Sequence, residues 1–92
     1  MKTKTIHGDL ILKKNTIIKS NLVVEVNIWG YYNLKVIGNI DAWNINARNI
    51  DAWNIIFCDK IKVKIGCKVI CKVLITDRFN IERKEQKLGE QK

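Results

Sequence analysis

The sequence predicts an all-β protein, a short parallel β-helix (β-solenoid) of about three coils. An asparagine or aspartate recurs at steps of six residues from position 9 to 39, then at steps of five to position 59. One and three positions after each marker the side chains are mostly apolar. Since residues two apart in a strand share a face, each unit contains a short strand with one apolar side. Such a unit cannot bury that side alone, so the units must wind and stack.

The recurring polar residues suit the corners of such a coil. Asparagine and aspartate tolerate left-handed backbone angles and bond to nearby main chain. Three six-residue units would close one triangular coil of about 18 residues. We therefore expect Asn21, Asn39 and Asn54 to stack above one another, with their amides in a hydrogen-bonded ladder. The markers are Asp9, Asn15, Asn21, Asn27, Asn33, Asn39, Asn44, Asn49, Asn54 and Asp59.

A different pattern runs from residue 60 to residue 76, where apolar residues alternate with others that are mostly lysine. This period of two is typical of a strand. We interpret it as one long strand bent near Gly66, or as two strands forming a hairpin, that continues or caps the solenoid. The solenoid domain then spans residues 1–76. Thr76 and Asp77 are suitable helix caps, so we expect a short helix or a frayed polar tail over residues 77–92.

The net charge of +8 is unevenly distributed. Residues 60–92 carry ten Lys/Arg and four Asp/Glu, whereas residues 1–59 carry seven and five. This asymmetry predicts an acidic partner, either a protein or nucleoprotein or RNA/DNA. The alternative is that lysine guards an exposed sheet edge and keeps the surface soluble. The lysines expected to lie in a row on one exposed strand face are Lys60, Lys62, Lys64, Lys68 and Lys72.

Aromatic residues near the expected corners are a second group of candidate binding residues. Exposed Trp and Tyr are common interface anchors and can stack on bases. Arg48 occupies the corner between Trp43 and Trp53 and could bind a carboxylate or a phosphate. Alternatively, the aromatic side chains pack against neighbouring corners. The group comprises Trp29, Tyr31, Tyr32, Trp43 and Trp53.

No motif predicts catalysis, a metal or a cofactor. Cys67 and Cys71, with Cys58 and His7, have an allowed zinc spacing. Both Cys67 and Cys71 nevertheless fall in the inward register of the alternation, where a thiol behaves as a small hydrophobe. The sequence has no glycine-rich phosphate loop, and His7 has no nearby nucleophile. We expect a non-enzymatic protein.

The cysteine count and the hydropathy pattern predict a location. Three cysteines are an odd number, which favours reduced thiols. No apolar stretch of about 18 residues indicates a transmembrane helix. The N-terminus lacks the apolar run of a signal peptide. We expect a cytoplasmic protein, in a bacterial or phage-infected cell, with no membrane partner.

Residues 38–55 read Gly-Asn-Ile-Asp-Ala-Trp-Asn-Ile-Asn-Ala-Arg-Asn-Ile-Asp-Ala-Trp-Asn-Ile. This run resembles small parallel β-solenoid proteins of bacteria and phages, which share Asn-Ile-(Asp/Asn)-Ala repeats and a Lys/Cys-rich end segment. The likeness covers roughly residues 7–76. The chain is also similar to pentapeptide-repeat proteins, although Ile precedes Ala here where that family places a small residue before a central Leu or Phe. Its six-residue faces are similar to those of bactofilin-type solenoids.

The resemblance implies a function by context. Small phage proteins of this size often block host defence systems, including CRISPR effectors. It therefore implies a binding or inhibitory module that occludes a host nucleoprotein. Two alternatives come from the residues: direct nucleic-acid binding through the lysine row, and a structural solenoid that assembles end to end. An open end coil also favours a homodimer.

Overall fold

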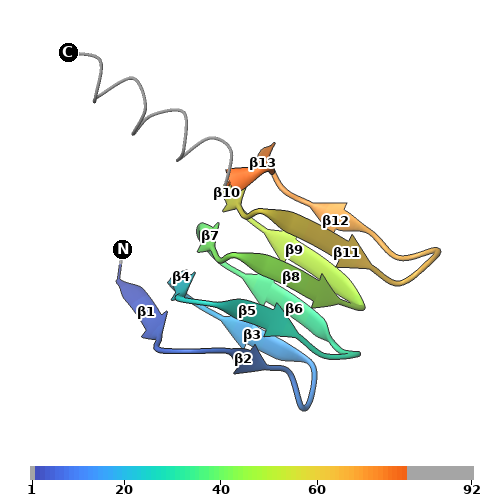
Figure 1. Cartoon of the computed structure of the whole chain (residues 1–92), viewed down its shortest axis with the longest axis horizontal. Coiled ribbons are helices and arrows are strands. Elements are labelled where there is room, and N and C mark those ends of the chain that lie inside the picture. The colour runs from blue at the N-terminus through green and yellow to red at the C-terminus, as the bar shows by residue number, and fades with distance from the viewer. Residues whose placement is uncertain (1, 79–92) are drawn as a thin grey trace.

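Short β-strands wind around a common axis in the computed structural model, which describes residues 2–78 (Figure 1). Every element in this part of the chain is a strand of two to four residues. The strands are β1 (Thr3–Ile6), β2 (Leu10–Ile11), β3 (Thr16–Ile18), β4 (Asn21–Val24), β5 (Asn27–Trp29), β6 (Asn33–Val36), β7 (Ile40–Asp41), β8 (Asn44–Ala47), β9 (Asn49–Ala52), β10 (Ile55–Phe57), β11 (Lys60–Val63), β12 (Val69–Ile70) and β13 (Val73–Ile75). The all-β prediction is confirmed.

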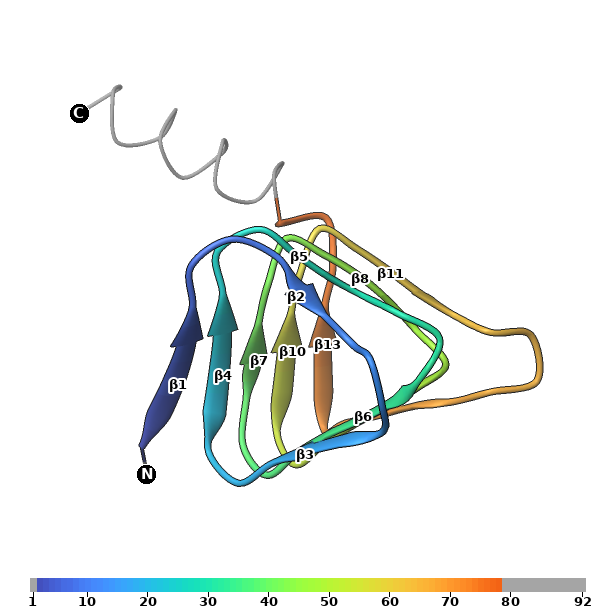
Figure 2. The same cartoon turned by 90° about the horizontal axis from the view of Figure 1, so that it is seen from below.

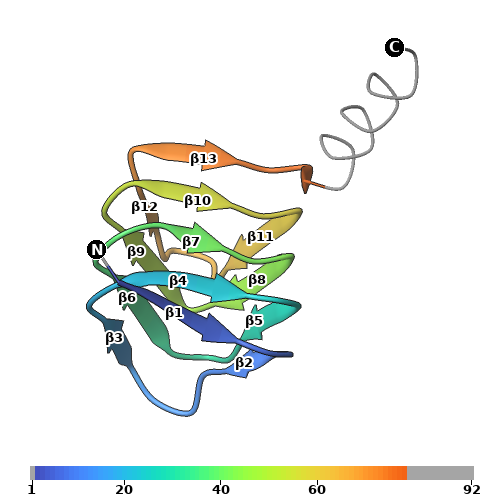
Figure 3. The same ribbon diagram turned by 90° about the vertical axis from the view of Figure 1, so that its left-hand side faces the viewer.

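Three parallel sheets form the walls of a triangular coil (Figure 2). Sheet A has the order β1-β4-β7-β10-β13, sheet B the order β11-β8-β5-β2, and sheet C the order β12-β9-β6-β3. Figure 3 shows the strands of sheet A rising in sequence order. The predicted parallel β-solenoid is therefore confirmed. It has four coils and the first strand of a fifth, rather than about three coils, because β1 precedes the first marker and β13 follows the last.

The register of the sheets changes where the repeat shortens. Thr3 pairs with Asn21, a step of 18 residues, whereas Asn33 pairs with Asn49, a step of 16. The shorter step follows from the five-residue units of the third coil. It also places Asn39 below Ile55, so the expected stacking of Asn54 on Asn39 is wrong.

The polar markers bond from one coil to the next. The side-chain oxygen of Asn21 accepts the backbone N–H of Asn39 at 2.9 Å, and that of Asn39 accepts the backbone N–H of Ile55 at 3.0 Å. In sheet C, the amide of Asn49 donates to the side-chain oxygen of Asn33 at 2.8 Å. The predicted ladder exists, but many of its bonds join a side chain to the backbone. It satisfies N–H groups at corners, where the strand ladder is interrupted.

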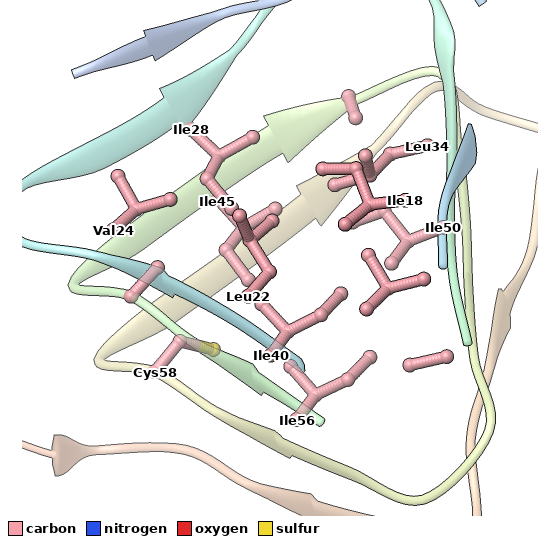
Figure 4. Close-up of a cluster of buried hydrophobic side chains, with 14 of the residues drawn as sticks. Ile18, Leu22, Val24, Ile28, Leu34, Ile40, Ile45, Ile50, Ile56 and Cys58 are labelled. Atoms are coloured by element: carbon pink, nitrogen blue, oxygen red, sulfur yellow. The ribbon is translucent and has the colours of Figure 1, made fainter. Parts of the chain in front are cut away.

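The core is a column of aliphatic side chains inside the triangle (Figure 4). All the buried residues are apolar, and isoleucine and leucine recur at equivalent positions of successive coils. The buried residues are Leu12, Ile18, Leu22, Val24, Ile28, Leu34, Val36, Ile40, Ala42, Ile45, Ala47, Ile50, Ala52, Ile56 and Cys58. Each of them lies in or beside a strand, and the inner-face prediction holds through the first three coils. In β10 it is wrong by one residue, because Ile56 and Cys58 are buried whereas Ile55, expected inward with Phe57, is exposed.

The alternating segment after residue 59 does not form one strand or a hairpin. It bends around the triangle as β11, β12 and β13, which belong to three different sheets. A tight turn follows β11, in which the N–H of Cys67 donates to the carbonyl of Lys64 at 2.9 Å. Gly66, with φ of 86°, supplies the positive angle that a type II turn requires at its third position. Three positions from the turn onwards depart from the predicted inward register. Ile65 is exposed, and in β13 it is Leu74 that pairs with the buried Ile56, so Val73 and Ile75 face outward.

The last strand among the described residues, β13, ends at Ile75. Of the segment 77–92, only Asp77 and Arg78 are among the described residues, and Asp77 has φ of 63°. The prediction of a helix or polar tail beyond them lies outside the described residues.

Gly30 is a position where the close approach of two coils demands glycine. A Cβ on Gly30 would lie 2.5 Å from the carbonyl oxygen of Leu12 and 2.7 Å from its Cβ. We expect Gly30→Ala to lower the free energy of unfolding by about 1–3 kcal/mol, because the overlap is with backbone. Urea denaturation measures the change. The control is Gly8→Ala, where φ is also positive but no atom lies within 4 Å; an equal loss there would assign the effect to backbone angle alone.

Asn39 tests the corner ladder. We expect Asn39→Ala to destabilise the protein by about 1–2 kcal/mol, because the Ile55 N–H loses its acceptor. Asn39→Asp retains an oxygen at the same place and should recover most of this loss in urea denaturation. Equal destabilisation by both substitutions would show that the Asn39 oxygen contributes little.

Candidate binding site

The predicted lysine row is divided among the walls and corners of the solenoid. Lys60 and Lys62 lie on β11 in sheet B, Lys68 precedes β12 in sheet C, and Lys72 precedes β13 in sheet A. The prediction of a single lysine face is therefore wrong. Lys60 and Lys62 share the outer face of β11, but the chain turns a corner before Lys68 and another before Lys72.

The three corner residues of the third coil are also separated. Trp43 lies between β7 and β8, Arg48 between β8 and β9, and Trp53 between β9 and β10. They occupy the three different corners of one triangle, so they do not form one surface. Trp29 is exposed at the end of β5 in sheet B, and Tyr32 is exposed just before β6.

Trp43 packs within the protein rather than standing free. The Arg78 guanidinium carbon lies 4.7 Å from the centre of the Trp43 ring and 4.8 Å from that of Phe57. Arg78 also forms an ion pair with Asp41 and donates to the carbonyl of Ala42 at 3.1 Å. Its side chain is only 15% exposed. These contacts link the residues after β13 to coils three and four. They agree with the alternative expectation that Trp43 packs within the protein.

Four of the predicted residues converge at one corner, between sheets B and C. Tyr31 comes from the β5–β6 connection, Arg48 from the β8–β9 connection, and Lys62 and Lys64 from β11 and the turn after it. Together they border a hollow of about 400 Å³, which Asn46, Ala47 and Val63 also line. We call Tyr31, Arg48, Lys62 and Lys64 the basic corner. Three successive coils contribute to it, and the Arg48 N–H bonds to the Tyr32 carbonyl at 3.0 Å.

The chemistry of the basic corner is that of an anion-binding surface. Its three cations have no ion-pair partner among residues 2–78, and no acidic residue lines the hollow. Arginine can bind a carboxylate or phosphate with two hydrogen bonds, and lysine adds point charge. Tyr31 is 84% exposed beside them. An anionic group with an adjacent flat or apolar part would fit this arrangement.

Ile65 is a candidate contact that the sequence pattern concealed. It follows Lys64 in the β11–β12 connection, which projects from the triangle in Figure 2. The residue is 99% exposed. In a straight strand it would face the core, as we expected. The turn closed by Lys64 and Cys67 removes it from that register. The dipeptide Ile65-Gly66 is the signal that could have indicated a type II turn.

A second hollow, of about 420 Å³, lies on the outer face of sheet C. Ile17 and Ile70 give it an apolar character, and Lys35, Asp51 and Lys68 give it charges of both signs. It has neither the single charge sign of the basic corner nor an aromatic side chain. We therefore place the candidate site at the basic corner.

The cysteines and the histidine are apart from this site. Within residues 2–78, no three His, Cys, Asp or Glu side chains are grouped as metal ligands would be. His7 contacts Glu25 at 2.6 Å, between Nδ1 and Oε1, on the surface. Cys58 is fully buried, and Cys71 is partly buried against the core. Cys67 is partly exposed in the β11–β12 connection.

Comparison of the chain with protein-family models, curated proteins and solved structures finds no match. In the part of the chain that the structure describes, no helix has the length and apolar character needed to cross a membrane. The fold and the site thus define a class only: a small parallel β-solenoid with a basic, aromatic corner.

Cys58 should make stability depend on alkaline pH. Burial, with Asp59 nearby, raises the pKa of its thiol from 9.0 to about 11. Between these two pH values the thiol ionises in the unfolded chain but not in the folded one. The contribution of Cys58 to the free energy of unfolding is therefore fully present below pH 9 and is lost as the pH rises towards 11. We expect Cys58→Ala to flatten this decline in urea denaturation, although it lowers stability throughout. Parallel curves for the two proteins would contradict the assignment.

Proposed function

We propose that this protein is a non-enzymatic binding module that holds an acidic protein partner at the basic corner. The convergence of Arg48, Lys62 and Lys64 on one hollow, from two successive coils, is the observation that carries the proposal. The fully exposed Ile65 favours a protein partner, because an aliphatic side chain gains most by burial in an apolar pocket. Tyr31 is a suitable interface anchor.

A narrower form of the proposal concerns inhibition. The resemblance to phage solenoids favours a partner within a host defence nucleoprotein, which the bound module would occlude. The acidic surface of such a partner would meet the basic corner, and no reaction would be required of the module.

Direct binding of single-stranded nucleic acid is the second candidate, and Tyr31 is the observation that favours it. A cationic groove with an exposed aromatic ring is the usual arrangement for tracking phosphates and stacking bases. Ile65 has no role in that arrangement. The two candidates therefore differ in whether Ile65 contributes to binding.

End-to-end self-assembly is the third candidate, and the charge distribution opposes it. The first coil, residues 2–20, carries five lysines and one aspartate, and the stretch 60–76 carries five lysines and no acidic residue. Stacking either end of one molecule on either end of another brings lysines together, which is destabilising. The same argument weakens the expectation of a homodimer through a solenoid end.

Charge reversal at the basic corner tests the main proposal. We expect Arg48→Glu combined with Lys64→Glu to weaken binding of fluorescent poly-L-glutamate at least tenfold and to reduce its salt dependence, because two contacts become repulsive. Fluorescence anisotropy at two salt concentrations measures both. The matched control is Lys13→Glu with Lys19→Glu, which makes the same charge change on the first coil. An equal loss in the control would show that only net charge matters.

Tyr31 and Ile65 distinguish the two candidate partners. If nucleic acid is the ligand, Tyr31→Ala should weaken binding of an oligodeoxythymidylate about tenfold or more, since stacking contributes about 1–3 kcal/mol per base. Ile65→Ser should then have no effect. If the ligand is a protein, Ile65→Ser should also abolish its capture from a bacterial lysate. Tight oligodeoxythymidylate binding that depends on Tyr31 but not on Ile65 would replace the protein partner by nucleic acid.

A further inference from the structure

The C-terminal end of the solenoid exposes an unfinished core. β11, β12 and β13 are the last strands of their sheets among the described residues. Their inward side chains, Ile61, Val63 and Val69, are only partly buried. Leu74 is 43% exposed, whereas Ile56, its partner one coil below, is fully buried. One more layer of apolar side chains would complete this surface.

The backbone of β11 offers an edge for such a layer. β11 is the longest of the three end strands, with four residues. It pairs with β8 on one side, where the Lys60 N–H reaches the carbonyl of Trp43 at 3.4 Å. Alternate residues of a strand bond to opposite neighbours, so Ile61 and Val63 direct their backbone groups away from β8. An edge of this kind is a template for an added strand.

The charges around this edge favour an acidic strand over a second copy of this chain as the binding partner. Lys60 and Lys62 project outward on either side of Ile61, and the stretch from Lys60 to Thr76 contains no acidic residue. A second copy of this chain would bring the lysines of one of its own end coils against them. A partner strand that alternates apolar and acidic residues would instead place its apolar side chains over Ile61 and Val63. Its carboxylates would then lie beside Lys60 and Lys62.

We infer that β11 is an acceptor for a β-strand from an acidic protein, which extends sheet B and covers the open end of the core. This surface shares Lys62 and Val63 with the hollow of the basic corner but does not include Tyr31 or Arg48. The inference does not require the proposed function, although one acidic partner could contact both surfaces. Strand addition supplies main-chain hydrogen bonds, and the alternating side chains supply specificity.

The test is a titration of the isotope-labelled full chain with a blocked peptide, Glu-Val-Glu-Val-Glu-Val, followed by nuclear magnetic resonance. We expect the largest shifts at Lys60–Val63 and at least tenfold slower amide exchange at Ile61 and Val63. The same peptide with lysine in place of glutamate should not bind. A peptide with N-methylated valines, which lacks the edge hydrogen bonds, should bind at least tenfold more weakly.

Two variants separate this surface from the basic corner. Ile61→Thr retains a β-branched side chain but removes apolar area, and we expect it to weaken peptide binding several-fold; unchanged exchange in β8 would show that the fold is intact. Tyr31→Ala should leave peptide binding unchanged. The inference is overturned if the shifts map to Tyr31 and Arg48 alone, or if the lysine peptide binds equally well. It is also overturned if the Ile61 and Val63 amides are already protected in the free protein, since this edge would then be covered.

Discussion

Pairing of each coil with the next in a parallel hydrogen-bond ladder is the constraint on which the rest of this structure depends. Each strand is only two to four residues long and could not persist alone. Stacking gives every strand of the middle coils a partner above and below, and it aligns the inward side chains into one apolar column. The asparagine side chains extend this bonding into the corners, where a chain that changes direction would otherwise leave N–H groups unpaired.

This mode of construction determines where a binding surface can arise. The inner positions are committed to the core, and the sheet faces present rows of similar residues from one coil to the next. The corners differ, because the number of residues there varies without disturbing the pairing. Tyr31, Arg48 and Lys64 all come from connections rather than from strands. A corner can therefore combine chemically different side chains from successive coils, as loops on rigid scaffolds generally do.

The two ends of the solenoid pose the opposite problem. A middle coil is covered on both sides, but an end coil exposes strand edges and part of the core. Lysines at both ends discourage pairing between copies, which is a common protection of exposed sheet edges. At the C-terminal end Lys60 and Lys62 alternate with Ile61 and Val63, and the acidic partner that we propose would be complementary to this arrangement.

The sequence alone determined the fold class and most of the core, because the spacing of asparagine and apolar residues directly reflects strand length and inward direction. Ile40, Ile45 and Ile50 were placed correctly on this basis. Only the tertiary structure decided which residues stack, because register depends on the summed length of a whole coil. The five-residue units therefore moved Asn54 out of the predicted stack. The period-two pattern after residue 59 also could not show where the chain turns. Those turns dispersed the lysines, exposed Ile65 and brought Lys62 and Lys64 beside Arg48 of the coil below.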